Sequence, residues 1–415
     1  MNPWLAGGTL LALLHAGLPW LFHQRLGLAV ASRVRAGRGE LALTFDDGPD
    51  PRTTPAVLEA LAEHGVRATF FLLHERARKH PELVRALVAA GHEVALHGGI
   101  HRHAWLKNPL RLYGELAEAK QALEELAGTP VRHYRPPHGG WTWPLLLATR
   151  RLGLVPVQWE VEAGDWVPGA TPKAVAAKVL ARVRPGSIVV MHDAGRGGEV
   201  AANALPRLLP ALLSAGYRPA PLAELRPVVA GLGELGPKLL APVEAAFARV
   251  YRVKPLGHGP HAILRIGPAP LPLDLPGYPR GTPAVELHLD SERLRRLGEV
   301  SPVAAYRAGQ RALADLARAA RTRAELKETQ VFFGITHFWE LLTPMGFEAV
   351  PLPPLTALRL GLWTRILHKL YGGRPLRRLE PRLVYLPRER LLRRYREPRA
   401  DEGDSHRHPE DLGQG

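Results

Sequence analysis

The sequence contains no cysteine among its 415 residues. Disulfide bonds, thiolate metal sites and a catalytic thiol are therefore excluded, and any metal must be bound by His, Asp or Glu side chains. The absence does not identify a compartment, because a chain without cysteine is compatible with either redox environment. No internal repeat is evident, and the length exceeds that of one ordinary domain.

Acidic residues are scarce relative to basic ones. The chain has 55 Lys and Arg against 39 Asp and Glu, a formal net charge of +16, which suits a polyanionic neighbour. More than half of this excess lies in residues 365–399, where twelve basic residues and three glutamates are interleaved with Leu and Tyr. No nucleic-acid-binding module accompanies them, so we interpret them as the outer face of packed elements and expect no nucleic-acid partner.

Charged side chains are absent from residues 3–22, PWLAGGTLLALLHAGLPWLF, a run just long enough to cross a bilayer. Trp4 and Trp20 near its ends are typical of a membrane interface, although a proline and a histidine interrupt the run. A secretory signal peptide would have a basic segment before the run and a small-residue cleavage site after it, and neither is present. We therefore predict a membrane anchor over residues 1–24.

A basic linker is predicted over residues 25–39. Its arginines follow the apolar run, and the positive-inside tendency would then leave the bulk of the protein in the cytoplasm. The side of the membrane stays open at this point.

Residues 40–225 repeat one pattern, a short apolar strand followed by a helix-like segment. The predicted strands are 41–45, 68–73, 92–96, 131–134, 155–159 and 187–191. The predicted helices are 53–64, 81–90, 110–127, 143–152, 172–182 and 201–215. This alternation predicts an α/β fold whose parallel sheet is covered by helices, and functional side chains then gather at the C-terminal ends of the strands.

A second, smaller unit is predicted over residues 228–399. Helix-like and strand-like segments are mixed there, which indicates an α+β fold; they are 236–251, 261–266, 284–290 and 303–327. The remaining tail, 400–415, is rich in acidic residues and is predicted to be disordered.

Two neighbouring carboxylates follow the first predicted strand, in the segment ELALTFDDGPDP. Asp46 and Asp47 each raise the cost of ionising the other. A tight turn is one explanation, since Asp before Gly-Pro is favoured in turns. The alternative is a metal cation that relieves the repulsion and leaves one Asp free to act as a base.

The third predicted strand leads into HGGIH, which places His97 and His101 four residues apart. A helix or a tight loop can bring two imidazoles with that spacing together. With Asp47 they would form the two-nitrogen, one-oxygen ligand set of an open catalytic zinc site. His103 is an alternative ligand.

Three later strand ends also carry polar clusters. RPPHGG, residues 135–140, joins an arginine to two prolines that fix the backbone and two glycines that permit close approach to a ligand. WEVEAGDW, residues 159–166, ends in an Asp-Trp pair that can hold a cationic side chain and form the wall of a pocket. SIVVMHD, residues 187–193, delivers a histidine at the end of a buried-type strand.

In this order the five segments resemble the polysaccharide deacetylases, carbohydrate esterase family four, over about residues 40–225, with TFDDGP as the most specific mark. The resemblance implies a deformed (β/α) barrel that removes N-acetyl groups from N-acetylglucosamine-type sugars of a polysaccharide or cell-wall glycan. It also implies a divalent metal, Zn²⁺ or else Co²⁺, Ni²⁺ or Mn²⁺, and a carbohydrate partner. Together with the apolar run it predicts a membrane-anchored protein of a bacterial cell envelope.

The resemblance also implies a role for each matching residue. The general base would be Asp46, oriented by Arg135. The general acid would be His192, with Asp165 tuning the charged network. The metal ligands would be Asp47, His97 and His101. The substrate pocket would be lined by Pro137, His138, Trp166 and Val190.

Four positions depart from the family's pattern. Gly98 stands where a Ser or Thr usually follows the first metal-binding His, and Glu162 replaces the first Asp of the DxxDW element. His138 replaces a large aromatic residue, which weakens stacking on a sugar, although its backbone N–H could still serve an oxyanion. Val190 stands where a Leu is usual. The catalytic set is complete, so the sequence predicts an active enzyme.

Two alternatives stay open at this point. One is an amidase of the same fold that acts on a small acylated molecule or a lipid-linked sugar. The other is a non-catalytic carbohydrate-binding module, which the departures at Gly98 and His138 would allow, although such a module needs neither Asp46 nor His192. The C-terminal unit resembles a YkoP-like domain, which names an architecture and no chemistry.

Overall fold

The protein is described here from a computed structural model. It describes residues 13–37, 39–231, 245, 246, 248–257, 259, 262–290, 293, 302–358, 360 and 380–395. Several sequence predictions fall outside the described residues: the first half of the membrane anchor, most of the helix 236–251 and the disordered tail 400–415.

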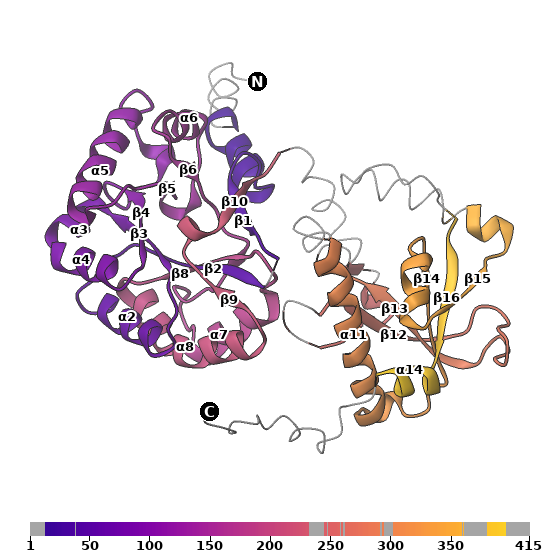
Figure 1. The fold of residues 1–415 in the computed structure, drawn as a ribbon. Helices are drawn as coiled ribbons and strands as arrows, with labels where there is room; N and C mark the ends of the chain where they lie inside the picture. The colour runs from indigo at the N-terminus through magenta and orange to yellow at the C-terminus, as the bar shows by residue number, and fades with distance from the viewer. Residues whose placement is uncertain are drawn as a thin grey trace, which may run out of the picture.

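The larger sheet has the strand order β6-β5-β4-β3-β2-β8-β7, with β9 beside β2. Its strands are β2 (Glu40–Asp46), β3 (Thr69–Leu73), β4 (Glu93–Gly98), β5 (His133–Tyr134), β6 (Val155–Pro156), β7 (Val161–Glu162), β8 (Ile188–His192) and β9 (Arg218–Pro219). All of these strands pair in parallel, and the sheet curls with helices on its outer side (Figure 1). The predicted α/β fold with a curled parallel sheet is confirmed.

The helices around this sheet are α2 (Thr54–Glu63), α3 (His74–Lys79), α4 (Pro81–Ala89), α5 (Leu112–Ala127), α6 (Trp143–Arg151), α7 (Pro172–Arg182) and α8 (Gly195–Ser214). Short 3₁₀ turns lie between them: η3 (Ala104–Leu106), η4 (Pro137–Gly139) and η5 (Leu222–Glu224). Thr142 and Thr171 begin α6 and α7, because each hydroxyl accepts a backbone N–H of the first turn at 3.3 Å.

Two helices differ from the sequence prediction. The highly charged segment that forms α3 was not predicted as a helix. Helix α8 begins six residues before its predicted start, in a glycine-rich stretch that does not resemble a helix. A side chain at Gly197 would approach His192 to 2.9 Å, and one at Gly198 would approach Thr53 and Asp193 to 2.7 Å. These glycines therefore allow the helix to pack closely against the end of β8.

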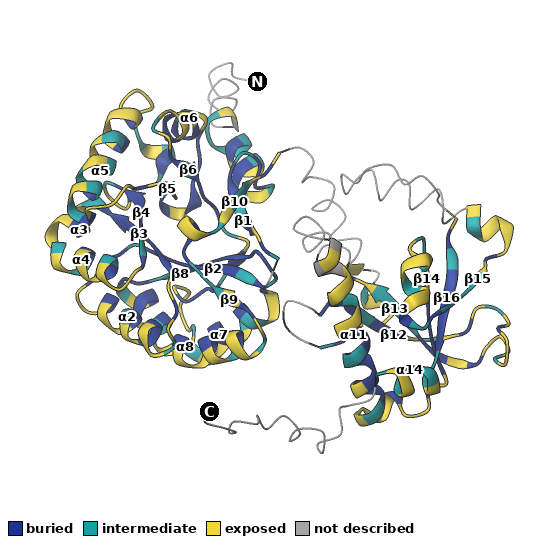
Figure 2. Cartoon of the chain, viewed as in Figure 1, coloured by how far each residue is buried: buried dark blue, intermediate teal, exposed yellow. Residues whose placement is uncertain are grey.

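Alternation along β2 separates the core from the polar centre. Leu41, Leu43 and Phe45 are fully buried among the helices, where the Phe45 ring stacks on Phe70 at 4.9 Å. The residues between them face the inside of the curled sheet, where the apolar Ala42 is followed by polar side chains toward the C-terminal end. Figure 2 shows buried strands surrounded by helices whose outer faces are exposed. Because successive side chains of β2 point to opposite faces, its outer face is apolar and packs against the helices. The C-terminal end of its inner face is polar.

Residues 25–39, predicted to be a basic linker, contain a strand of the domain instead. Strand β1 (Ala31–Arg35) pairs antiparallel with β10 (Arg226–Val229), and it also bridges Val157 and Ser187 of the larger sheet. The linker prediction is wrong because the arginines alternate with apolar residues, of which Val30 and Val34 are buried. The pairing also attaches residues 228 and 229, predicted to start the second unit, to the first one.

The described end of the predicted membrane anchor packs on the same domain. It is helical from residue 13 to residue 25, as two π-helical turns, η1 (Leu13–Gly17) and η2 (Trp20–Arg25), joined by residues 18 and 19. His23 is buried, its ring meets the Trp143 ring edge-on at 4.7 Å, and its Nδ1 lies 2.7 Å from Leu28 O. In the part of the chain that the structure describes, no helix is long and apolar enough to cross a membrane.

The second sheet has the order β11-β12-β13-β14-β16-β15 and pairs antiparallel except between β13 and β14. Its strands are β11 (Lys254–Pro255), β12 (Leu264–Pro270), β13 (Pro283–Leu289), β14 (Val331–Thr336), β15 (Glu348–Pro351) and β16 (Arg382–Pro387). Its helical segments are α11 (Pro302–Thr322), η7 (Ala324–Leu326), α12 (Trp339–Leu342), η8 (Thr343–Met345) and α14 (Arg388–Arg394). Helix α11 buries Leu316 and Ala320 against Phe332 and Leu386 of the sheet, which gives this unit its own α+β core.

A chain that starts at Gly39 should be much less stable than one that starts at Leu13, because only the first lacks β1. Loss of the buried Val30 and Val34 removes about 1.5–3 kcal/mol each. We expect the unfolding temperature of the shorter chain to fall by about 5 °C or more, as measured by calorimetry. Equal unfolding temperatures would show that β1 does not contribute to the fold.

Candidate active site

The two aspartates at the end of β2 have different partners. Asp46, the last residue of the strand, is buried and its Oδ1 accepts a hydrogen bond from Arg135 Nη1 at 2.7 Å. Asp47 has a φ of 78°, a left-handed conformation that Asp tolerates better than most residues. This turn directs the Asp47 carboxylate away from Arg135 and toward two histidines. The turn explanation and the metal explanation of this pair are therefore compatible, since the turn is what separates the carboxylates.

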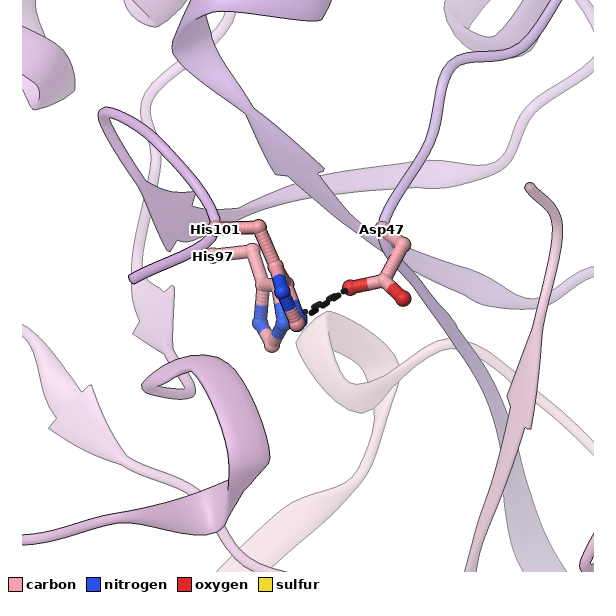
Figure 3. Close-up of side chains that lie close together, drawn as sticks. All are labelled: Asp47, His97 and His101. Atoms are coloured by element: carbon pink, nitrogen blue, oxygen red, sulfur yellow. Dashed lines mark ion pairs between the residues drawn. The ribbon is translucent and has the colours of Figure 1, made fainter. Parts of the chain in front are cut away.

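Two imidazoles converge on Asp47 (Figure 3). Asp47 Oδ1 lies 3.2 Å from His97 Nε2 and 3.1 Å from His101 Nε2. One ligand atom from each of the three residues lies within 4.8 Å of the other two. Strand β4 supplies His97, and the loop after it returns His101 to the same point, as the four-residue spacing predicted.

The three residues fit a divalent cation. Asp47 Oδ1 is a buried oxygen without a hydrogen bond, although two imidazole nitrogens point at it. Burial would raise the pKa of Asp47, but the neighbouring His101 and His97 outweigh burial and hold that pKa well below its usual range. A carboxylate between two imidazoles is the donor set of an open zinc-type site.

His103, the alternative ligand, lies beside this cluster and not in it. Its Nδ1 accepts the Trp105 N–H at 3.4 Å, and its ring stacks on His138 at 5.2 Å with an interplanar angle of 11°. Burial, followed by the charge of His101, lowers the pKa of His103. The His103 ring therefore stacks on His138 beside the cluster of Asp47, His97 and His101 and does not belong to it.

Arg135 is fully buried and holds several polar groups of the site in place. Its Nη1 donates to both Asp46 and Thr44 Oγ1, the latter at 2.8 Å, and its Nη2 donates to Gln158 O at 3.2 Å. The guanidinium also lies 4.2 Å from the centre of the Phe71 ring. Burial lowers the pKa of Arg135 while the Asp46 carboxylate raises it. Sequence reasoning assigned no role to Thr44, although it is the first residue of TFDDGP, and it missed Gln158, which belongs to no motif.

His192 and Asp165 form a second ion pair, at the end of β8. His192 Nδ1 lies 2.9 Å from Asp165 Oδ1, and the His192 backbone N–H donates to Asp165 Oδ2 at 2.7 Å. Burial alone would lower the pKa of His192, but Asp165, with smaller contributions from Asp46 and Asp47, raises it to about 9. His192 and Asp46 are register partners on adjacent strands. Asp46 and His192 therefore lie on the same side of the sheet, and each has its own charged partner, Arg135 for Asp46 and Asp165 for His192.

The residues predicted to line the pocket are unequally exposed. Pro137 and Val190 are buried, whereas His138 and Trp166 are exposed. The Trp166 indole N–H donates to Glu162 at 3.0 Å, so this departure from the family's pattern holds the indole. His138 has a φ of 59°, and its ring meets His101 edge-on at 4.4 Å.

The structure explains why glycine stands at position 98 and what Asp193 does near the site. Gly98 has a φ of 116°, which side-chain-bearing residues rarely adopt, so the backbone here accounts for the missing hydroxyl. Asp193 is fully buried, where its carboxylate accepts the Gly48 N–H at 3.0 Å and the Thr54 hydroxyl at 2.7 Å. Burial and the charge of Asp47 raise the pKa of Asp193 to about 7. Asp193 thus fixes the turn behind Asp47; its only sequence signal is its place beside His192.

Comparison with known proteins identifies relatives of both units. A family model described as polysaccharide deacetylase matches residues 33–157, and a YkoP domain model matches residues 279–395. A chitooligosaccharide deacetylase from Bradyrhizobium is 37% identical over 202 residues, which are 46% of this chain and 92% of that protein. A peptidoglycan-N-acetylglucosamine deacetylase from Bacillus cereus is 34% identical over 44% of this chain and 66% of its own length. A solved peptidoglycan N-acetylglucosamine deacetylase structure is 32% identical, with 49% of this chain and 96% of that chain covered and a TM-score of 0.46.

Replacement of His97 by Ala should abolish binding of a divalent metal, whereas replacement of His103 by Ala should not. The two residues belong to the same segment, but only His97 converges on Asp47. Metal content per chain, measured by mass spectrometry after chelation and reconstitution, checks this. Binding should also weaken on acidification, because only neutral imidazole binds a metal. Metal retained in His97→Ala and lost in His103→Ala would contradict the assignment.

Proposed function

The chain belongs to the polysaccharide deacetylase family, and we propose from this membership and its site that it removes N-acetyl groups from N-acetylglucosamine-containing glycans. It is a metal-dependent hydrolase of amide C–N bonds, and its products are acetate and a free amine on the sugar. The observation that carries this function is the Asp47–His97–His101 cluster beside a base candidate, Asp46, and an acid candidate in register with it.

Asp47, His97 and His101 would hold the cation. A bound divalent cation supplies Lewis-acid chemistry, which favours deprotonation of water and polarises an amide carbonyl. We propose Zn²⁺, because two imidazoles and one carboxylate are a ligand set typical of catalytic zinc; Co²⁺, Ni²⁺ and Mn²⁺ can use the same donors.

Asp46 is the proposed general base. Arg135 holds its carboxylate in one orientation through a 2.7 Å hydrogen bond, so the carboxylate is positioned to accept a proton. The attacking water gives its proton to Asp46 while its oxygen bonds to the acetyl carbon.

His192 is the proposed general acid. With its pKa raised to about 9, it is protonated at neutral pH and can protonate the departing amine. Asp165 keeps the ring oriented through Nδ1, which leaves Nε2 for the proton transfer.

A backbone amide of the turn η4 is the proposed oxyanion donor. Gly139 N–H and Gly140 N–H are used within the turn, at 2.9 Å from Pro136 O and 3.1 Å from Pro137 O. For the His138 N–H the structure records no hydrogen bond to any described residue. This amide is therefore free to stabilise the negative charge that develops on the acetyl oxygen. The exposed Trp166 would form the wall of the acetyl pocket.

Replacement of Asp46 by Asn should lower the rate of acetate release from N-acetylglucosamine oligomers by about 10²–10⁴-fold, because the general base is lost. Metal content should be unchanged, because Asp46 faces Arg135 and not the histidines. Asp47→Asn is the matched control and should lose metal and activity together. A near-parental rate for Asp46→Asn would contradict the mechanism. An equal rate of acetate release by the parent enzyme with and without chelator would contradict the metal dependence.

The pH–rate profile should have an alkaline limb at or below about 9, because deprotonation of His192 removes the general acid. A cation on Asp47 would offset part of the charge that raises this pKa, so the limb can lie lower. Asp165→Asn removes the main charge partner and should move the limb to lower pH. His192→Ala should abolish the limb. A limb unmoved by Asp165→Asn would exclude His192 as the titrating acid.

A further inference from the structure

The segment between His101 and α5 exposes more apolar surface than an ordinary loop. Leu106 is 67% exposed and Leu110 is 92% exposed, and Ile100 and Tyr113 are exposed on either side of them. Single exposed leucines are common on protein surfaces, but four large apolar side chains within fourteen residues form a patch that indicates an interaction. We call these four residues the apolar rim.

The apolar rim is held in place by hydrogen bonds and is not a loose loop. Asn108 accepts the Leu110 N–H with Oδ1 at 3.0 Å and the Arg111 N–H with its carbonyl at 3.1 Å, a turn that presents Leu110 to solvent. Upstream, Ala104 is buried and the Trp105 indole donates to Trp141 O at 3.2 Å. The fold thus displays these leucines at a defined position beside His101.

Basic side chains lie among the exposed leucines. Arg102, Lys107 and Arg111 line a cavity of about 480 Å³ whose apolar wall includes Leu112 and Leu145. Lys107 lies 3.5 Å from Glu115, whereas no ion pair joins Arg102 or Arg111 to another described residue. Glu115 and Glu118 line the same cavity, so the surface combines leucines with a small excess of basic side chains.

A second group of exposed apolar side chains lies next to this surface through residues 141–143. Trp143 is exposed, and its ring lies 6.2 Å from Phe22 of the N-terminal turns, where Trp20 and Leu21 are also exposed. From Pro3 onward the sequence that leads into these turns contains no charged side chain before Arg25. Both groups flank the start of α6.

We propose that the apolar rim, Trp20, Leu21 and Trp143 together form a contact surface for an anionic lipid bilayer. Leucines that enter the outer part of the hydrocarbon, aromatic rings at the interface and arginines among the headgroups are the composition of interfacial binding. Arg102 and Arg111, which form no ion pair with another described residue, favour anionic lipid over neutral lipid. This contact places the loop of His97 and His101 at the membrane surface, where lipid-attached or wall-proximal glycans lie. The lipid contact itself does not rest on the proposed function.

Vesicle co-sedimentation of the full chain tests the proposal. The parent should bind vesicles of phosphatidylglycerol mixed with phosphatidylcholine more strongly than pure phosphatidylcholine. Leu106→Ser combined with Leu110→Ser should weaken partitioning by about tenfold or more, because two leucine side chains no longer leave water. Arg111→Glu should weaken binding to the anionic vesicles only.

Matched controls separate this surface from the overall positive charge. Leu213→Ser makes one such Leu-to-Ser change, and Arg207→Glu makes the same charge reversal as Arg111→Glu, both at exposed positions of α8, which packs against α2 and α7. They should bind like the parent, and all variants should keep the parental unfolding temperature. The proposal would be overturned if the parent did not bind the vesicles or if the rim variants bound as strongly as the parent. It would also be overturned if the α8 variants weakened binding as much as the rim variants do. Acetate release from soluble oligomers reports separately on the proposed function, which can fail while lipid binding persists.

Discussion

The buried ion pair between Arg135 and Asp46 is the constraint on which the polar centre depends. A fully buried guanidinium is costly unless its donors are used. Here the two Nη groups donate to Asp46, Thr44 Oγ1 and Gln158 O, whereas Nε has no hydrogen-bond partner among the described residues. These partners lie on β2 and just after β6, so the arginine of the segment after β5 joins separate parts of the curled sheet. Removing either charge would leave the other buried without a partner, which is why Asp46 and Arg135 have to be considered as one unit.

The pair also resolves the cost of placing two aspartates side by side. Asp46 faces a permanent cation, while the left-handed backbone of Asp47 directs the second carboxylate to two imidazoles and the metal that they fit. Asp193 holds the turn from behind through the Gly48 N–H. On the other side, His192 has its own anionic partner in Asp165. The proposed base and the proposed acid thus lie in register on adjacent strands, each beside its own charged partner, which a module that only binds carbohydrate would not require.

The N-terminal residues belong to this architecture as well. Val30 and Val34 of the supposed linker are core residues, and Gln24 donates to His138 O at 3.1 Å, at the turn whose amide we propose as the oxyanion donor. A segment whose composition suggested only a membrane anchor and a spacer therefore contacts the rim of the site. The exposed aromatic and leucine side chains on both sides of the start of α6, which we propose to contact lipid, lie near the same edge of the site.

Sequence alone determined the features that local chemistry dictates. Strand and helix alternation follows from the periodicity of apolar residues, and the TFDDGP, HGGIH and RPPHGG segments specify the side chains that a deacetylase needs, because each segment carries its chemistry in a few neighbouring residues. Features that depend on residues distant in the chain were decided by the tertiary structure. Strand β1 is apparent only once β10 and the edge of the sheet are present, and Thr44, Gln158 and Asp193 acquire their roles from partners that no spacing reveals. The choice of His101 over His103 beside Asp47 belongs to the same class, since loop geometry and not residue type brings one imidazole to the carboxylate.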